Sequence, residues 1–482
     1  MSRSPLRLFF WLLTLLAMAG LLLPVLMRDG MFLDGLTYAS ISRNLSQGIG
    51  DFWKPHYTAT LYPAFYEHPP LVFGIQSLFF RVLGDGILTE RIYSLLTALV
   101  TAWGISALWN LFARETRLSG FSWLPVLLWI LTPVVFWSYR NNMLENTLTP
   151  MTLFSIWFLC KASLTGRHWW LLPASLLILA AFLSKGPVGL FPLVTIPVYA
   201  LSVKKIFDLK DLSFATLAIA LPFIFLLILL WIFPDAKTSL SNYLQNQLIP
   251  SLSGSREVTS ASRFTIVYYL FLQLAFPLIL LLAVWLWARR RHPKPETSFD
   301  RLTQAGHSGL FLILVGLSAS LPLVVTLKQR DFYLVPALPY LVLGISFYLA
   351  PILGRLLSPV SDRTWRWASL PVVLILLSLL LHTTITAGKP GRDRNMVSDV
   401  RQVSALVPAG TIVHTSVATW QNWKLAAYLA RYGNISLDCD SPRDYILMDD
   451  TIRDETFLMS GLTEKIFKGQ VITLYSKPST AR

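Results

Sequence analysis

Charged residues are scarce in this chain of 482 residues. Asp, Glu, Lys and Arg make up 14% of it, whereas about 25% is usual in soluble globular proteins. Hydrophobic residues make up 54%, and the mean hydropathy is +0.55. The scarcity of charge excludes a soluble enzyme and a disordered tail protein, and the apolar excess predicts an integral membrane protein.

Cysteine and acidic residues are also few. The two cysteines, Cys160 and Cys439, stand on very different segments, which excludes a disulfide framework and argues against a zinc site. Asp and Glu number 26 against 41 Lys and Arg, so the formal net charge is +15. The basic residues stand in short groups between apolar runs and do not alternate with aromatics on one face, so the pattern argues against nucleic-acid binding.

Long apolar runs are what the sequence has in abundance. A helix needs about 20 apolar residues to cross a bilayer core that is about 30 Å thick. Suitable runs predict about eleven membrane-spanning helices, near residues 9–27, 91–112, 120–138, 146–160, 169–184, 187–203, 212–233, 264–288, 308–327, 332–352 and 367–387. The first run begins like a signal peptide, but it continues to Met27, so we expect an uncleaved span.

The loops between these runs predict an orientation. If the N-terminus is cytoplasmic, every cytoplasmic loop is basic, as the positive-inside rule requires. These loops hold Arg114 and Arg117, Lys161 and Arg167, Lys204, Lys205 and Lys210, Arg289–Arg291 with Lys294 and Arg301, and Arg355, Arg363 and Arg366. Counting the apolar segment 69–84 as a span would break this pattern. We therefore expect it to form a helix at the outer interface, starting at Pro69-Pro70.

The sequence thus predicts two domains. The first, 1–387, is the membrane domain, with a first extracytoplasmic loop at 28–89 that contains interfacial helices and a second loop near 234–263. The second, 388–482, is a small extracytoplasmic α/β domain. Apolar runs at 411–415, 445–448 and 471–475 predict strands, and 420–431 predicts a helix.

Charges near a membrane are costly, and their positions are therefore informative. Apart from the cytoplasmic loops and the tail, the charges stand almost entirely at the outer ends of the spans. The topology brings residues more than a hundred positions apart to one surface. Solvated loop ends are the alternative for any one of them. That alternative is weakest for Lys185 and Lys328, which lie in very short links between apolar runs.

The first loop supplies several candidate site residues. Asp34 opens the pattern Asp34-Gly35-x-x-Tyr38-Ala39 at the start of an interfacial helix that also carries Arg43. The alternative role of Asp34 is to cap that helix. Further on, Glu67 and His68 precede the rigid Pro69-Pro70 pair. His68 is a candidate hydrogen-bonded interface residue, proton carrier or phosphate contact, and the sequence does not choose among these.

Three later outer corners supply the others. Glu145 lies in a polar corner that begins at Arg140, and Lys185 lies in the turn Ser184-Lys185-Gly186-Pro187, in which Gly186 and Pro187 are expected to break the helix. The last corner holds Lys328, Arg330 and Tyr333. Fixed cations beside carboxylates suit a phosphate-bearing ligand, because the cations hold the phosphate and an acid can accept a proton.

In these residues the chain resembles the membrane-embedded glycosyltransferases of the GT-C fold, in particular the lipid A aminoarabinose transferase and the protein O-mannosyltransferases. The resemblance covers roughly residues 5–350. It rests on the order of four weak elements: the first-loop Asp-x-x-x-Tyr-Ala, the Glu-x-Pro-Pro, the Ser-Lys-Gly-Pro turn and the late Tyr-x-x-Pro. The family's extracytoplasmic C-terminal domain also fits the tail.

The resemblance implies roles for individual residues. Asp34 matches an aspartate proposed to bind or deprotonate the acceptor, Glu67 and Glu145 match acids of the same cavity, Lys185 matches a lysine facing the donor phosphate, and Tyr333 matches a tyrosine near the carrier lipid. Two positions depart from the lipid A enzymes, which have Arg where this chain has Thr37 and Lys where it has His68. Arg43, Lys328 and Arg330 are candidates to compensate for these two missing cations.

The implied reaction is the transfer of a sugar from a polyprenyl-phosphate sugar to a hydroxyl of a lipid, glycan or protein. It takes place on the outer face of a bacterial-type inner membrane, with inversion at the anomeric carbon and Asp34 as general base. The cations stabilise the phosphate leaving group, so we expect no metal and no other cofactor. The alternatives are a transporter or flippase of lipid-linked sugars, and a glycan polymerase or ligase. Transporters usually show paired repeats with interrupted midplane helices, whereas here the charges line one face.

Overall fold

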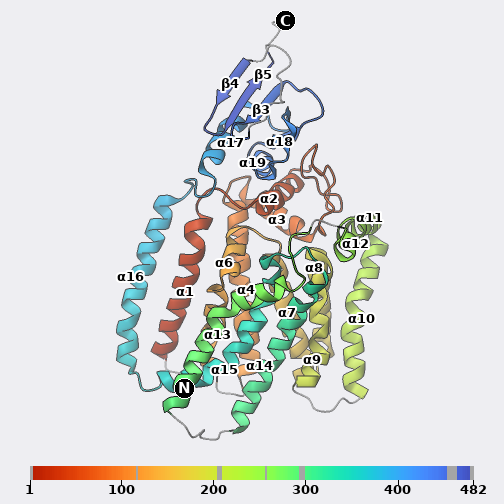
Figure 1. Cartoon of the computed structure of the whole chain (residues 1–482). Helices are drawn as coiled ribbons and strands as arrows, with labels where there is room; N and C mark the ends of the chain where they lie inside the picture. Colours follow the sequence, from red (N-terminus) through yellow and green to blue (C-terminus); the bar gives the residue numbers. More distant parts are fainter. Residues whose placement is uncertain are drawn as a thin grey trace.

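The computed structural model describes residues 4–114, 118–202, 209–255, 258–291, 299–452 and 464–477. It is a bundle of long helices with a small sheet domain at one end (Figure 1). Two short helices, α2 (Leu33–Ser46) and α3 (Leu71–Leu83), lie between the bundle and the sheet domain. The chain is therefore a multi-pass membrane protein with a separate C-terminal α/β part, as the sequence predicts.

Long apolar helices make up the bundle. Among the described residues, eight helical stretches are long and apolar enough to cross a membrane, or nine if one bent pair is counted as a span. Six lie within single helices: α1 (Ser4–Leu26), α4 (Thr89–Ala113), α10 (Leu209–Ile232), α13 (Thr265–Arg291), α15 (Leu338–Leu357) and α16 (Asp362–Thr386). A seventh is α14 (Phe299–Ser320) continued by a short 3₁₀ segment. Prolines such as Pro222 inside α10 are accommodated, as is common within membrane helices.

This number is roughly consistent with the eleven expected runs, and the difference has two sources. The runs at 169–184 and 187–203 form one helical stretch, made of η2 (His168–Trp170), α8 (Leu171–Lys185), η3 (Gly186–Val194) and α9 (Thr195–Ser202). Within it, η3 packs back against α8. The short run at 146–160 is helical as α7 (Glu145–Thr165), but it is not among the stretches apolar enough to span.

The bent pair is a consequence of one proline. The helical segment η1 (Ser119–Phe121) with α5 (Trp123–Ile130) meets α6 (Pro133–Arg140) at 73°. Pro133 lacks an N–H and disfavours helical backbone in the residue before it. Thr132 is accordingly extended, with φ −70° and ψ 123°, and Pro133 begins the next helix.

Shorter helices cover the end of the bundle that carries the sheet domain. The segment 69–84 forms α3, which is too short to span and lies beside α2 (Figure 1), as expected. The second loop forms α11 (Pro234–Tyr243), the π-helix η4 (Leu244–Leu248) and α12 (Ile249–Ser253). Two short 3₁₀ segments, η5 (Leu321–Val325) and η6 (Asp331–Leu334), connect α14 to α15.

The C-terminal part is a small α/β domain. Helices α17 (Arg394–Leu406), α18 (Val417–Trp420) and α19 (Trp423–Gly433) accompany a five-stranded sheet of order β2-β1-β3-β5-β4. The strands are β1 (Ile412–His414), β2 (Ser436–Asp438), β3 (Tyr445–Asp449), β4 (Glu464–Lys468) and β5 (Ile472–Ser476). β1 pairs in parallel with β2 and β3, whereas β5 is antiparallel to β3 and β4. The three expected strands and the expected helix are present.

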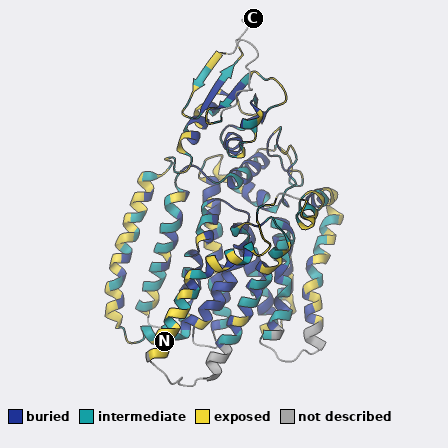
Figure 2. Cartoon of the chain, viewed as in Figure 1, coloured by how far each residue is buried: buried dark blue, intermediate teal, exposed yellow. Residues whose placement is uncertain are grey.

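The C-terminal domain and the first loop share one hydrophobic core. Leu36, Ile41 and Phe73 of the loop helices pack in the same cluster as Val400 and Leu429 of the C-terminal domain. Figure 2 shows buried residues concentrated in the bundle interior and in this contact region, whereas α10 and α16 carry exposed side chains along much of their length. These exposed side chains are mostly apolar, such as Leu227 and Leu374, which suits contact with lipid.

Buried charges also join the two parts. Arg431 forms ion pairs with Glu90 at 2.9 Å and with Asp85 at 2.7 Å, and Arg431 and Glu90 are each 2% exposed. Asp29 is paired with Arg401 and accepts a hydrogen bond from the Tyr432 hydroxyl. Because buried charges are stable only when paired, these contacts fix the C-terminal domain over the first loop.

Candidate functional site

Asp34 lies in the first turn of α2, close to the polar corner between α6 and α7. The cap residue of α2 is Phe32, and Asp34 makes no capping bond there. The backbone N–H of Phe32 donates to Oδ1 of Asn141 at 2.9 Å, which holds the start of α2 against the corner. A Cβ atom on Gly35 would lie 2.1 Å from the carbonyl oxygen of Asn141. Only glycine permits this approach, which sets the position of Asp34.

Glu145 and Lys185 form a buried ion pair at the ends of two adjacent helices. Glu145 is the first residue of α7, Lys185 is the last residue of α8, and their side chains are 1% and 11% exposed. Gly186 ends α8 with φ +73°, and a Cβ there would lie 2.2 Å from the hydroxyl oxygen of Tyr243. The expected helix break therefore occurs, and it leaves Lys185 at the helix end.

The first and second loops build one wall around Glu67 and His68. The Tyr62 hydroxyl and Nε2 of Gln247 both donate to Oε1 of Glu67, at 3.0 Å and 3.2 Å. The hydroxyl of Tyr38 lies 3.3 Å from Nε2 of His68. A helix places residues four apart on one face, so Tyr38 shares a face of α2 with Asp34.

The link between α14 and α15 builds the opposite wall. Lys328 and Tyr333 come from this link, and the ammonium of Lys185 lies 4.9 Å from the centre of the Tyr333 ring. The backbone N–H of Lys328 donates to Oγ1 of Thr326 at 3.1 Å. A lysine near an aromatic face is held by the electron-rich ring, so Tyr333 helps to position Lys185.

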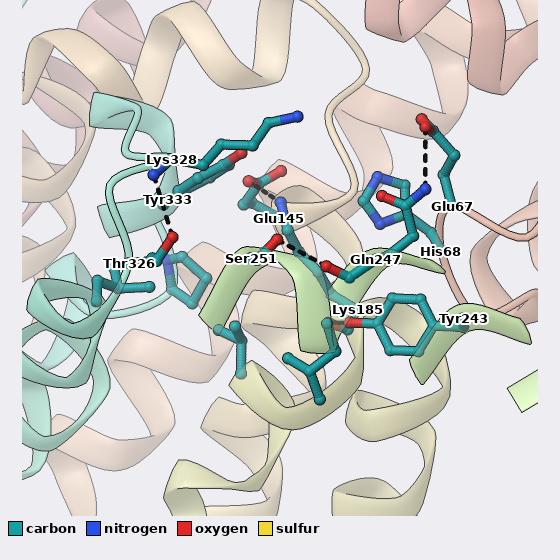
Figure 3. A pocket seen from close by; sticks show the side chains of 14 residues that line it. Glu67, His68, Glu145, Lys185, Tyr243, Gln247, Ser251, Thr326, Lys328 and Tyr333 are labelled. Carbon is teal, nitrogen blue, oxygen red and sulfur yellow. Dashed lines mark hydrogen bonds and ion pairs between the residues drawn. The ribbon is translucent and has the colours of Figure 1, made fainter. Parts of the chain in front are cut away.

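These walls enclose a pocket of about 140 Å³. Figure 3 shows the Glu145–Lys185 pair in the middle, with Lys328 and Tyr333 on one side and Gln247, Glu67 and His68 on the other. The structure therefore brings together six of the nine predicted site residues, from four separate stretches of the chain: Glu67, His68, Glu145, Lys185, Lys328 and Tyr333.

The carboxyl of Asp34 interacts electrostatically with charged residues that line the pocket. The pKa of its carboxyl is raised from 3.8 to about 6, chiefly by burial and also by the neighbouring Glu145 and Glu67, while Lys185 and Lys328 oppose the rise. A carboxyl with such a pKa is mostly ionised at pH 7 and still able to accept a proton. Strongly perturbed acids next to a pocket are typical of functional sites.

Arg43 and Arg330 do not line the pocket. Arg43 is 2% exposed and turns to the C-terminal domain, where Nη1 donates to the carbonyl of Arg431 at 2.9 Å and Nη2 donates to Oδ1 of Asn434 at 3.1 Å. Arg330 is exposed. Thr37, where the lipid A enzymes have Arg, donates to the Tyr57 hydroxyl at 3.3 Å.

Sequence reasoning missed the residues of the second loop. Tyr243, Gln247 and Ser251 line the pocket from α11, η4 and α12. Their signal in the sequence is a polar stretch rich in Asn, Gln and Ser between two apolar runs. The signal for Tyr38 is its spacing of four from Asp34, which places both on one face of the helix.

Metal ligation has no evident site here. Among the residues that the structure describes, no group of three or more His, Cys, Asp or Glu side chains is arranged to hold a metal ion. The expectation that the reaction needs no metal stays a prediction.

Comparisons with known proteins agree with this geometry. Residues 67–231 match the family described as dolichyl-phosphate-mannose-protein mannosyltransferase. The structure is similar to ArnT from Cupriavidus metallidurans bound to undecaprenyl phosphate, with a TM-score of 0.63, 16% identity and 98% of each chain covered. The apo state of the same protein gives a TM-score of 0.61, 16% identity and 97% coverage of each chain. No curated protein matches the sequence.

The matched segment contains Glu67, His68, Glu145 and Lys185, which are four of the six predicted residues that line the pocket. The structural similarity extends over nearly the whole chain, including the C-terminal domain. The chain therefore has the GT-C fold of ArnT, and it resembles the membrane glycosyltransferases of the ArnT and protein mannosyltransferase type.

Proposed function

We propose that this protein transfers a sugar from a polyprenyl-phosphate sugar to an acceptor hydroxyl on the extracytoplasmic side of the membrane, with inversion at the anomeric carbon. The observation that carries the proposal is the pocket itself. Two lysines and two carboxylates line it, and Asp34 interacts electrostatically with all four of them, which are Lys185, Lys328, Glu67 and Glu145. The undecaprenyl phosphate bound to the similar ArnT structure supports a lipid phosphate as the ligand.

The proposed chemistry is a single displacement. The acceptor oxygen attacks the anomeric carbon, and the bond between that carbon and the phosphate oxygen breaks. Asp34 takes the proton of the acceptor hydroxyl as general base. Lys185 and Lys328 stabilise the charge that develops on the phosphate, and polyprenyl phosphate leaves. Glu145 keeps Lys185 in place through their ion pair.

The distribution of basic residues supports an outer location for the pocket. Glu145 begins α7 and Lys185 ends α8, so Lys161 and Arg167 lie near the opposite end of this helix pair. α7 has 21 residues, which corresponds to about 30 Å at 1.5 Å per residue. Basic residues favour the cytoplasmic side, so the pocket and the C-terminal domain are extracytoplasmic in this proposal.

A transfer assay tests the function directly. Purified protein in lipid nanodiscs is incubated with a radiolabelled short-chain polyprenyl-phosphate sugar and candidate acceptors. We expect free polyprenyl phosphate to be released in step with labelling of the acceptor. Movement of the intact donor across vesicles, without cleavage of the sugar–phosphate bond, would contradict the proposal and support a transporter.

The acceptor class needs a separate experiment, because a lipid, a glycan and a protein hydroxyl all suit the proposed reaction. Mass spectrometry of envelope lipids, glycans and glycoproteins from a deletion strain should show one class that loses a single sugar. A strain that regains the sugar only with the unaltered gene, and not with the Asp34→Asn variant, would tie the product to this pocket.

A further inference from the structure

Two oxygen atoms in the pocket lack a hydrogen-bond partner among the described residues. They are Oε2 of Glu145 and Oε1 of Gln247. The other carboxylate oxygen of Glu145 is paired with Lys185. The amide nitrogen of Gln247 donates to Glu67, which leaves the amide oxygen directed elsewhere. Both residues line the pocket.

Both of these atoms are hydrogen-bond acceptors. The other buried polar atoms without a partner in the described part of the chain belong to residues that do not line this pocket. Leaving a buried acceptor unpaired is costly, and the cost is greater for a charged group. The pocket is thus arranged for a ligand that brings hydrogen-bond donors to this place. Hydroxyl and ammonium groups can donate, whereas an ionised phosphate or carboxylate cannot.

The positions of the side chains give the pocket two chemically different ends. In Figure 3 Lys328 and Tyr333 lie on one side of the Glu145–Lys185 pair, and Gln247 lies with Glu67 on the other. One end offers a cation and the other offers acceptors and a second carboxylate. Anionic groups are favoured at the first end and disfavoured at the second.

The backbone at Gln247 is also unusual. This residue lies in η4, a π-helix between α11 and α12. Such segments are rare and occur frequently at functional sites, because the extra residue in the turn redirects the side chains. Here the π-helix contributes both Gln247 and Leu248 to the pocket wall.

From these observations we infer that Glu145 and Gln247 form a sugar subsite. It accepts a sugar with free hydroxyl or amino groups and excludes one that carries a carboxylate. The inference rests on the proposed function, because it assigns the phosphate of the donor to the end at Lys328. It adds which atoms contact the sugar and which charge class of sugar is transferred.

A panel of donors tests the charge class on the unaltered protein, without any substitution. Three short-chain polyprenyl-phosphate donors carry a neutral hexose, the corresponding amino sugar and the corresponding uronic acid. We expect kcat/KM for the uronic acid to be at least about tenfold below the better of the other two, since close like charges repel. Turnover of the uronic acid equal to or above the others would overturn the inference and leave the proposed function standing.

A substitution tests the subsite by separating sugar binding from phosphate binding. Isothermal titration calorimetry in detergent compares a sugar-bearing donor with polyprenyl phosphate alone. Gln247→Ala should weaken the donor about fivefold, the usual effect of one lost hydrogen bond, and leave polyprenyl phosphate unchanged. Lys328→Ala should weaken both ligands. The matched control is Asn246→Ala, which alters an exposed neighbouring amide outside the pocket lining and should change neither.

The outcomes distinguish failure of the sugar subsite from failure of the proposed function. If Gln247→Ala weakens polyprenyl phosphate as much as the donor, or weakens neither, the subsite assignment is wrong while the proposed function stands. If the unaltered protein binds neither ligand, the proposed function fails, and the subsite fails with it.

Discussion

The first loop and the start of α4 contribute acids to two buried clusters that are built in opposite ways. At the contact with the C-terminal domain, both oxygens of Glu90 are bonded to Arg431, and both oxygens of Asp29 are bonded as well. At the pocket, Glu145 keeps one oxygen without a partner, and burial raises the pKa of Asp34, which interacts electrostatically with the lining residues. Acids with both oxygens bonded indicate a structural role, whereas a buried acid with a raised pKa or an unbonded oxygen indicates a group kept for a ligand.

The largest expected effect concerns Asp34. Replacement of Asp34 by Asn removes the proposed base and should lower the transfer rate about 10²- to 10⁴-fold. The folded protein raises the pKa of this carboxyl from 3.8 to about 6, so ionisation destabilises the fold as the pH rises through this interval. The neutral amide should therefore unfold at the same temperature as the unaltered protein or slightly above it, as measured by thermal unfolding in detergent.

The control for that variant is Asp444→Asn, in which the altered side chain is 90% exposed in the C-terminal domain. It should retain full activity and stability. If Asp34→Asn kept most of its transfer activity, the assignment of Asp34 as the base would be wrong. The functional role assigned to the pocket cluster would then lack support.

Disruption of the charge cluster at the contact with the C-terminal domain should lower the stability of the protein. Arg431→Ala leaves Glu90 buried without its partner, and the loss of one member of a buried pair costs about 3–5 kcal/mol. Thermal unfolding measures the effect. Arg443→Ala is the matched control, because Arg443 pairs with Asp438 nearer to the surface, with 37% of its side chain exposed, and such pairs contribute about 1 kcal/mol or less. Equal losses in the two variants would contradict the structural role assigned to Arg431.

Gly35→Ala tests how α2 positions Asp34. The new Cβ would clash with the carbonyl of Asn141 and displace the helix. Overpacking of this kind costs about 1–3 kcal/mol, and a shift of the base by about 1 Å can cost on the order of 100-fold in rate. We therefore expect a large fall in kcat together with a modest fall in stability. Gly86→Ala is the control, because its Cβ would meet nothing within 4 Å.

The smallest expected effect is a pH dependence. With a base of pKa about 6, kcat/KM should fall about tenfold between pH 7 and pH 5, as the carboxylate becomes protonated. Initial rates across this range measure it, with thermal unfolding at each pH to exclude loss of the fold. A flat profile would contradict Asp34 as the base. The residual activity of Asp34→Asn should lack the inflection.

Much of the site could be predicted because it depends on topology. Glu145 and Lys185 are forty positions apart, but each stands where a long apolar run meets a polar corner, and alternate corners lie on the same side of the membrane. Helical geometry separates Arg43 from the pocket. Nine residues at about 100° each place it half a turn away from Asp34, so the two cannot face the same pocket, and Arg43 contacts the C-terminal domain instead.

The residues of the second loop could not be predicted in the same way. Gln247 reaches Glu67, which is 180 positions earlier in the chain, through a π-helical turn that has no clear sequence signature. The same limit applies to the contact between Arg431 and Glu90, because it requires the C-terminal domain to dock on the first loop.

The sequence by itself determined the class of protein and the order of its apolar helices. The transfer of each apolar run from water into lipid or protein interior is favourable largely independently of the other runs. Local composition is therefore enough to decide which segments become apolar helices. Only the tertiary structure decided which outer charges meet. The rotation of each helix and the docking of the C-terminal domain depend on side-chain packing between segments distant in the chain. That packing pairs Asp29 and Glu90 with the C-terminal domain but leaves a buried oxygen of Glu145 without a hydrogen-bond partner.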